Sequence, residues 1–440
     1  MIQIVQLLLS LSILVILHEL GHYLAAKFFG CRVEKFYLFM DWPYALFKKK
    51  IGETEFGIGC APLGGYVKIA GFVDESMDSK GFESEPEEWE LRAKPAWQRL
   101  IIMLGGIFVN IILAWFIYSM IAFSWGEKYT PMSGLVDGFS FSPSAKKIGF
   151  ADGDQILSVD GKRLTEYDPM LMSVILFEGA KNITVLRNGF EKNIEIRESV
   201  VNEIIKGIEK GSGPFMSPNI RWIVGGFVDS SPSKKSGVEV GDRILAIDSL
   251  STLFYQPQAI FEYLSSKAKA TVSLKVNRGF NTLLIDVPVG DDGKIGIFPS
   301  NSEYEKLRSY SFFNSFSAGL DKTIRIVKMY VGQIKTMFNP STGAYKHMGG
   351  FISIGQMFPS DWNWLVFWSM TALLSIILAI MNLLPIPALD GGHALIAIVE
   401  IFSGKKIPLK VLMPLQVAGM VFLLGLVLYA NGMDIWRLFN

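Results

Sequence analysis

The chain has 440 residues, of which 50% are hydrophobic, and its mean hydropathy is +0.33. It is therefore too long for one small domain and too apolar for an ordinary soluble protein, and we expect a membrane protein. Its 42 basic and 41 acidic side chains give a formal net charge of +1, which indicates neither a nucleic-acid partner nor a strongly acidic one.

The first expected element is a membrane-spanning helix over residues 3–29. Residues 2–17 have only Gln and Ser as polar interruptions. No basic segment precedes this run and no small-residue cleavage site follows it, so we expect a retained helix and not a signal peptide. The basic residues at and after the C-terminal end of this run are Lys27, Arg32, Lys35 and the lysines at 48–50. By the positive-inside rule, the C-terminal end of the helix is therefore cytoplasmic and its N-terminus is outside.

Within this helix, positions 18–22 read His-Glu-Leu-Gly-His. A four-residue offset places the imidazoles of His18 and His22 on one helix face, where they can be two ligands of a zinc ion. Glu19 is then the residue type that acts as a base beside the metal. A carboxylate at bilayer depth costs about 2.5–3.5 kcal/mol on insertion scales, so a polar cluster there indicates a function. The alternative, a helix whose polar residues cap the membrane edge, does not explain this spacing.

Two short extended runs, 54–59 and 66–70, flank turn residues at 61–65 and predict a β-hairpin. The edge of a lone hairpin is a template for another strand, so an extended substrate could add to it; an ordinary cytosolic hairpin is the alternative. Residues 73–90 are acidic and polar and predict a solvated connector. Both cysteines, Cys31 and Cys60, fall in this cytoplasmic region, which argues against a disulfide framework.

Residues 97–123 predict a second spanning helix. Arg92, Lys94 and Arg99 lie at its start, so this helix runs outward. Its small and amide residues at 105, 106 and 110 share one side, and close helix packing is their expected role.

An internal repeat lies in the insert between about residues 125 and 313, where no apolar run is long enough to span a membrane. Residues 142–160 recur as 231–248 with one residue deleted. Each copy predicts a short helix, a Gly-Asp turn and an apolar strand, and strand candidates follow at 183–186 and 271–276. The repeated unit resembles a PDZ domain of the form found in bacterial proteases, with copies at 125–220 and 221–300. PDZ domains bind extended peptides by strand addition, so the resemblance implies a peptide-selecting module; a steric spacer is the alternative.

Residues 312–338 predict an amphipathic helix, at the membrane surface or against the other helices. His347 follows in a Gly-rich loop within 301–362, where we expect a solvated side chain and not a ligand. A third spanning helix is expected at 364–384, ended by Pro385 and Pro387. A loop and a fourth span at 407–431 complete the chain, which places both termini and the insert outside.

Asp390 follows the prolines that end the third span. A carboxylate at the edge of a membrane helix is energetically costly, so its presence there indicates a function. Zinc needs a third protein ligand, for which Asp390 is our candidate and His393 ranks second. A helix-capping role for Asp390 is the alternative.

Together, the His-Glu-Leu-Gly-His motif, Gly106 to Asn110, the tandem repeat, and Asn382-Leu383-Leu384-Pro385 with Asp390-Gly391-Gly392 resemble the site-2 protease family of intramembrane zinc metalloproteases. The resemblance covers essentially the whole chain. The chain departs from the family at Gly106, where a proline is usual, and at Gly349-Gly350-Phe351, where a Gly-Pro-Ile-like stretch is common. Neither departure touches a proposed ligand.

The resemblance implies one Zn²⁺ held by His18, His22 and Asp390, with Glu19 as general base. It also implies that Asn382 and the re-entrant hairpin at Gly64, Gly65 and Tyr66 hold the substrate strand. The expected fold is an α-helical polytopic membrane protein, with four transmembrane helices and a membrane-associated β-hairpin, carrying a tandem of α+β PDZ domains.

The function implied is hydrolysis of single-pass membrane proteins, such as anti-sigma factors or remnant signal peptides, in a bacterial inner membrane. The PDZ pair would admit substrates already trimmed by an upstream site-1-type protease, and the active site would face the cytoplasmic side. Three alternatives remain from the residues themselves. They are an ion-coupled transporter, although no inverted repeat of spans is visible, an inactive PDZ adaptor, and a membrane-anchored zincin with its site outside the bilayer.

Overall fold

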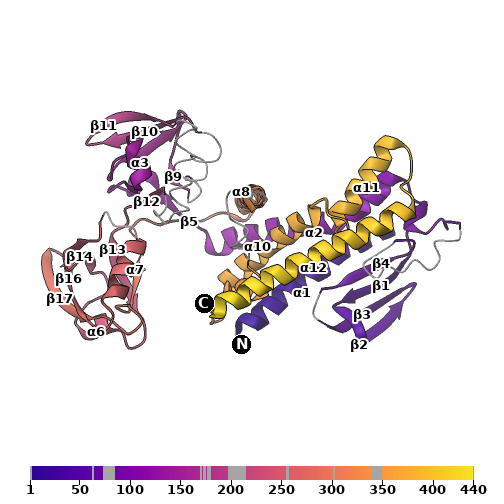
Figure 1. Cartoon of the computed structure of the whole chain (residues 1–440), viewed down its shortest axis with the longest axis horizontal. Helices are drawn as coiled ribbons and strands as arrows, with labels where there is room; N and C mark the ends of the chain where they lie inside the picture. Colours follow the sequence, from indigo (N-terminus) through magenta and orange to yellow (C-terminus); the bar gives the residue numbers. More distant parts are fainter. Residues whose placement is uncertain are drawn as a thin grey trace. The chain divides into compact units, whose positions relative to one another are not determined.

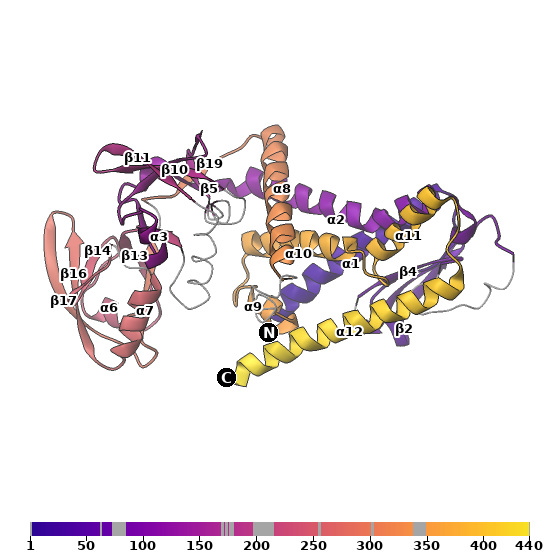
Figure 2. The same cartoon turned by 45° about the horizontal axis from the view of Figure 1, so that its top comes forward.

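The protein forms two compact units in the computed structural model, a helical unit (Met1–Gly126 and Ser309–Asn440) and an insert (Glu127–Arg308). The structure describes residues 2–61, 64–72, 85–168, 171, 175, 180–196, 215–253, 257–300, 303–337 and 349–439. His347 and most of the connector expected at 73–90 lie outside the described residues. Figures 1 and 2 show the chain in two views.

The described residues contain four helices that are long and apolar enough to cross a membrane, and they lie where the sequence predicted the four spans. The fourth begins and ends later than the 407–431 expected from the sequence. The four helices are α1 (Ile2–Phe28), α2 (Ala96–Trp125), α10 (Trp364–Leu383) and α12 (Leu409–Phe439).

Helix α2 is the centre of the helical unit, because it packs against α1, α8 (Phe312–Met337), α10 and α11 (Asp390–Ser403). Figure 2 shows α8 crossing α2 and α10. Helix α8 is the predicted amphipathic helix, and its partly buried apolar residues contact the core between α2 and α10. Of the two positions expected for it, the structure therefore shows α8 packed against the other helices.

Asp390 lies beyond the end of the third span, at the start of the next helix. Helix α10 ends at Leu383, and a new helix, α11, begins at Asp390 where a loop was expected. Pro385 and Pro387 interrupt the helical hydrogen bonds, and an acidic residue is favourable in the first turn of the helix that follows. A further short helix, α9 (Phe351–Gln356), precedes α10.

The predicted hairpin between the runs at 54–59 and 66–70 is wrong, although both runs are strands. They belong to a four-stranded sheet of order β2-β3-β1-β4. Strand β1 lies between β3 and β4, parallel to the former and antiparallel to the latter. The real hairpin is β2–β3, and β4 is an edge strand next to α1. The bounds are β1 (Val33–Leu38), β2 (Met40–Ile51), β3 (Thr54–Ala61) and β4 (Tyr66–Ile69), with a 3-10 turn η1 (Leu91–Ala93) before α2.

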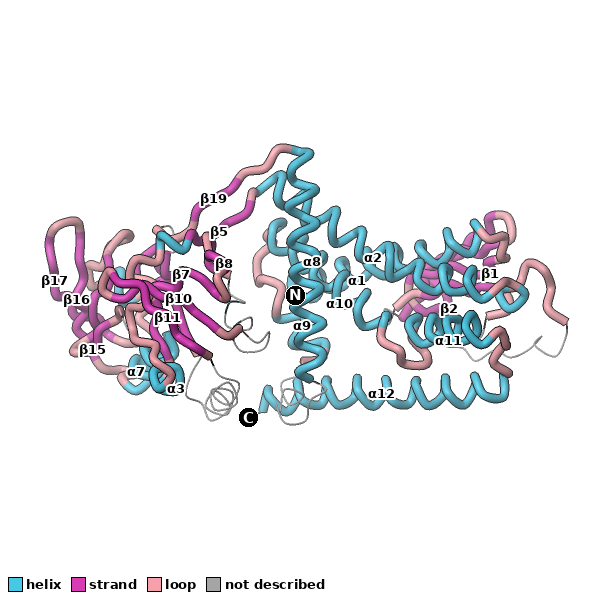
Figure 3. Tube along the Cα trace, turned by 90° about the horizontal axis from the view of Figure 1, so that it is seen from above, coloured by secondary structure: helices cyan, strands magenta, loops and turns pink. Residues whose placement is uncertain are grey.

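The sequence repeat folds into equivalent elements within the insert, whose strands are shown in Figure 3. Ser142 and Ser231 each accept a hydrogen bond from a backbone N–H at the start of a short helix, and a proline follows each serine. Each copy then adds three strands in the same order, β11-β10-β7 and β17-β16-β14, over its own hydrophobic core. The equivalent elements are α3 (Pro143–Lys147), β7 (Gln155–Val159), β10 (Asn182–Arg187) and β11 (Phe190–Glu195), and α6 (Pro232–Lys235), β14 (Arg243–Ile247), β16 (Thr271–Arg278) and β17 (Asn281–Pro288).

The other elements of the insert are β5 (Glu127–Pro131), η2 (Met132–Gly134), β6 (Phe139–Phe141), β8 (Lys162–Arg163), β9 (Glu166–Tyr167), β12 (Met216–Pro218), β13 (Trp222–Phe227), β15 (Leu250–Ser251), α7 (Pro257–Ser266), β18 (Ile297–Ser300) and β19 (Lys306–Arg308).

Candidate metal centre

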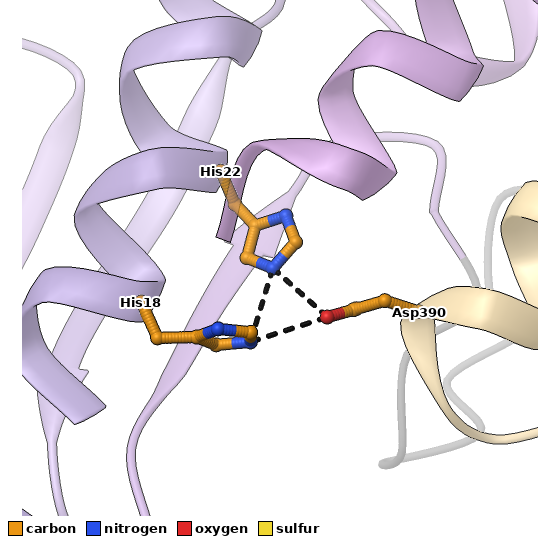
Figure 4. Close-up of side chains that lie close together, drawn as sticks. All are labelled: His18, His22 and Asp390. Carbon is orange, nitrogen blue, oxygen red and sulfur yellow. Dashed lines mark hydrogen bonds and ion pairs between the residues drawn. The ribbon is translucent and has the colours of Figure 1, made fainter. Parts of the chain in front are cut away.

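His18, His22 and Asp390 converge, although they come from opposite ends of the chain (Figure 4). Asp390 Oδ2 lies 3.1 Å from His18 Nε2 and 3.3 Å from His22 Nε2. The two Nε2 atoms are 3.3 Å apart, and both histidines are buried. Helical periodicity places the imidazoles on the same face of α1, and the packing of α11 brings the carboxylate to them.

His393, the second-ranked candidate ligand, is not part of this cluster. Its ring packs against Phe72, with ring centroids 4.8 Å apart, and it lines the same cavity as the cluster. Burial lowers the pKa of His393 and outweighs the opposing effect of Asp390, so this imidazole is neutral at neutral pH.

The three side chains fit a zinc ion by the chemistry of their donor atoms. His22 Nδ1 lies 2.8 Å from the carbonyl oxygen of Ile102. A neutral His22 therefore carries its proton on Nδ1, and its Nε2 has a free lone pair directed at Asp390 and His18. Asp390 Oδ2 is buried and accepts no hydrogen bond from the described residues. Two imidazoles and a carboxylate are the donor set of a three-ligand zinc site, to which water or a substrate can add as the fourth ligand.

A carboxylate must be ionised to bind a metal, and charged histidines beside Asp390 would favour that form. Burial raises its pKa, but the adjacent His22 and His18 lower it further, and the net pKa lies well below that of an ordinary aspartate.

Every residue that the sequence suggested for the site lines one cavity of about 650 Å³, including Glu19, Asn382 and the segment from Gly64 to Tyr66. Glu19 follows the first histidine directly and accepts a hydrogen bond from the backbone N–H of Val67 on β4. The edge strand is therefore bonded to the carboxylate beside the cluster.

Two positions around the cluster are fixed by backbone and side-chain contacts. A Cβ atom at Gly65 would lie 2.6 Å from the carbonyl oxygen of Tyr37, so only glycine fits there. Asn382, on the last turn of α10, places its amide Nδ2 3.1 Å from His18 Nε2. The cavity thus has an edge strand on one side and a polar amide from α10 on another.

The sequence-based interpretation missed the contact of Asn110 with the cluster, because close helix packing was the role that we expected for it. Its amide lies 3.1 Å from His18 Nδ1 and is completely buried. The available signal was the regular four-residue spacing of Ile102, Gly106 and Asn110, which places all three on one face of α2.

Comparison with known proteins shows which family the chain resembles in sequence. A family model described as Peptidase family M50 matches residues 6–426. The chain is 27% identical to the regulator of sigma E protease of Haemophilus influenzae, over 98% of each chain. It is 26% identical to the regulator of sigma-E protease RseP of Escherichia coli K12, over 92% of each. It is also 28% identical, over 97% of each, to a Clostridium perfringens protein whose name describes a candidate zinc metalloprotease.

Proposed function

The chain belongs to peptidase family M50, the site-2 proteases, and from this premise we propose that it cleaves single-pass membrane proteins within or beside their membrane-spanning segments. It is a zinc metalloprotease with several helices able to span a membrane. The convergence of His18, His22 and Asp390 beside Glu19 carries the proposal. This assignment favours a protease over the transporter and the inactive adaptor considered from the sequence.

Glu19 is the base of the proposed reaction. His18, His22 and Asp390 would hold the zinc ion, one per chain, which would supply a Lewis acid for the scissile carbonyl and for the attacking water. Glu19 accepts the proton of that water and delivers it to the leaving amine. The N–H of Val67 holds the Glu19 carboxylate in place during both steps.

Strand β4 is the proposed binding edge for the substrate. A transmembrane helix hides its scissile bond within its own hydrogen bonds, so it must unwind before hydrolysis. Strand β4 pairs with β1 along one side and is at the edge of its sheet. Addition of the unwound segment along β4 would bond its backbone again and bring it beside Glu19. Tyr66 on this strand, together with Asn382 across the cavity, would then contact the substrate.

The insert is the proposed selection module. Its two copies of one fold support the PDZ resemblance, and PDZ domains take extended peptides. We infer that they admit substrates already trimmed by an upstream site-1-type protease. The Haemophilus relative is named as a regulator of sigma E. We therefore propose anti-sigma-factor-like membrane proteins as one substrate class, and remnant signal peptides, which are also single-pass, as another.

The proposed location is the bacterial inner membrane. The basic residues after α1 and before α2 and α12 support a cytoplasmic position for these helix ends, by the positive-inside rule. Both termini and the insert are then periplasmic, and the metal centre faces the cytoplasmic side of the bilayer.

The decisive experiment compares zinc content and cleavage in one variant. Purified wild-type protein should contain about one zinc per chain. Glu19→Gln should keep the metal but lose about 10²- to 10⁴-fold in cleavage of a single-pass substrate in proteoliposomes. Glu53→Gln, an exposed position in the β2–β3 turn, is the matched control and should cleave normally. Wild-type cleavage by Glu19→Gln would exclude Glu19 as the base, and wild-type protein without zinc would exclude the metal centre.

A further inference from the structure

Helix α2 presents three successive turns of one face to the two histidines of the cluster. The carbonyl oxygen of Ile102 lies 2.8 Å from His22 Nδ1. One turn later, a Cβ atom at Gly106 would lie 2.4 Å from His22 Nε2 and 2.7 Å from His18 Cε1, so in this chain α2 packs directly against both rings. The departure from the family at Gly106 therefore lies beside the proposed ligands, contrary to the expectation from the sequence. One turn further, the amide of Asn110 lies 3.1 Å from His18 Nδ1.

Each histidine can offer Nε2 to a metal only if its proton is on Nδ1, because a neutral imidazole carries one proton. A buried Nδ1–H needs an acceptor. For His22 the carbonyl of Ile102 is that acceptor. For His18, the described group that faces Nδ1 is the side chain of Asn110.

The amide of Asn110 can serve both proton positions of His18. In the structure, Nδ2 faces the ring nitrogen, while the buried Oδ1 has no partner among the described residues. A donor at this place suits a ring protonated on Nε2, where Asp390 Oδ2 can accept. The amide Nδ2 of Asn382, 3.1 Å from the same Nε2, suits instead the form in which Nε2 carries a lone pair. A half-turn about the Cβ–Cγ bond of Asn110 exchanges the two ends of the amide. Oδ1 then accepts the Nδ1–H, and Nε2 is free to bind a metal.

We propose that Asn110 is a positioning residue that sets the proton position and orientation of His18 by accepting its Nδ1–H when the metal binds. The proposal rests on the zinc site proposed above. Groups bonded to the second nitrogen of a ligand histidine typically change metal affinity by about 10- to 100-fold when they are removed. The contact that α2 makes with α10 here is separate, because Ser375 Oγ donates to the backbone carbonyl of Asn110 and not to its side chain.

The test measures zinc affinity in the purified full-length protein by competition with a chelator, independently of cleavage. Asn110→Ala and Asn110→Leu remove the acceptor, one leaving a cavity and the other filling it, and both should weaken zinc binding about 10- to 100-fold. Asn110→Asp keeps an acceptor and should bind zinc at least as tightly as the wild type. Ser375→Ala is the matched control for the contact between α2 and α10 and should leave zinc affinity unchanged.

A second readout is the visible absorption spectrum of the Co²⁺-substituted protein, which reports the arrangement of the ligands. Asn110→Asp should keep the wild-type spectrum, and Asn110→Leu should alter it. Wild-type zinc affinity in both Asn110→Ala and Asn110→Leu would overturn the proposal, as would equal loss of affinity in Asn110→Asp and Asn110→Leu. If one of the two apolar variants does not fold, the other and Asn110→Asp still decide between these outcomes. Failure of the underlying metal site is distinguishable, because the wild type itself would then bind no zinc.

Discussion

Gly21 of α1 and Gly105 of α2 face each other with no space for a side chain on either helix. A Cβ atom at Gly21 would lie 2.3 Å from the carbonyl oxygen of Gly105, and one at Gly105 would lie 2.6 Å from that of Gly21. Because Gly21 is next to His22, this contact sets how close the metal centre comes to α2. Small residues commonly allow such close approach between membrane helices.

Gly105→Ala should push α1 and α2 apart and disturb the metal centre. Overpacking of this kind costs about 1–3 kcal/mol. We expect a lower unfolding temperature and a lower zinc content in the purified protein. In Gly425→Ala, on α12, the added methyl group meets no described atom within 4 Å, and both quantities should stay at wild-type values. Normal zinc content in Gly105→Ala would mean that α1 and α2 can separate without affecting the ligands.

Asn382→Leu should separate substrate handling from metal binding. We expect this variant to keep its zinc, because His18, His22 and Asp390 hold the ion in the proposed site, but to lose on the order of 10²-fold in kcat/KM, as when one preorganised donor is removed. Asn363, at the opposite end of α10, caps the helix by accepting the N–H of Val366. Asn363→Ala should cost about 1 kcal/mol of stability and leave kcat/KM unchanged. Loss of zinc in Asn382→Leu would instead make Asn382 part of the metal centre.

Removal of the insert should relax substrate selection without loss of the metal. Its first and last residues, Glu127 and Arg308, pair with each other on the antiparallel strands β5 and β19, so a short linker can replace everything between them. The shortened protein should bind zinc and cleave both trimmed and untrimmed single-pass substrates, whereas the full chain should cleave the trimmed form. Measurement of both rates in proteoliposomes checks this. If the shortened protein cleaves the trimmed substrate alone, the insert is not the filter.

Arg187→Gln should destabilise the first copy within the insert. Arg187 donates to both carboxylate oxygens of Asp154 at 2.6 and 2.7 Å, and Asp154 is completely buried. Loss of the cation leaves a buried charge without its partner, which costs about 3 kcal/mol. Hydrogen exchange at the amides of β7 and β10 in the full-length protein should accelerate accordingly. The exposed Arg163→Gln provides the control, and unchanged exchange in Arg187→Gln would show that Asp154 is stabilised by its other bonds.

The Asp–Arg ion pair occurs once in each copy of the repeat, and this shows which parts of the fold the sequence can predict. The Gly-Asp turns at Asp154 and Asp242 recur at equivalent places in the two copies. Asp154 precedes β7 and binds Arg187 on the neighbouring strand β10, and Asp242 precedes β14 and binds an arginine on the neighbouring strand β16. Local patterns of this kind predicted the repeat and the four membrane helices. The same reasoning failed for β4, because β1 lies between β3 and β4. Pairing between strands that are not adjacent in the chain leaves no local signal.

The sequence by itself determined which reactive side chains this protein has and on which faces of their helices these side chains lie. The spacing of His18 and His22 defines one side of α1, and the hydrophobic runs define the membrane helices, because both depend on the period of a helix. The tertiary structure decided which groups meet. It brought Asp390 and not His393 to the histidines, made β4 the edge beside Glu19, and placed Asn110 against His18. Local periodicity shows which side of a helix is used, but only the packing of α1, α2 and α11 determines what lies opposite that side.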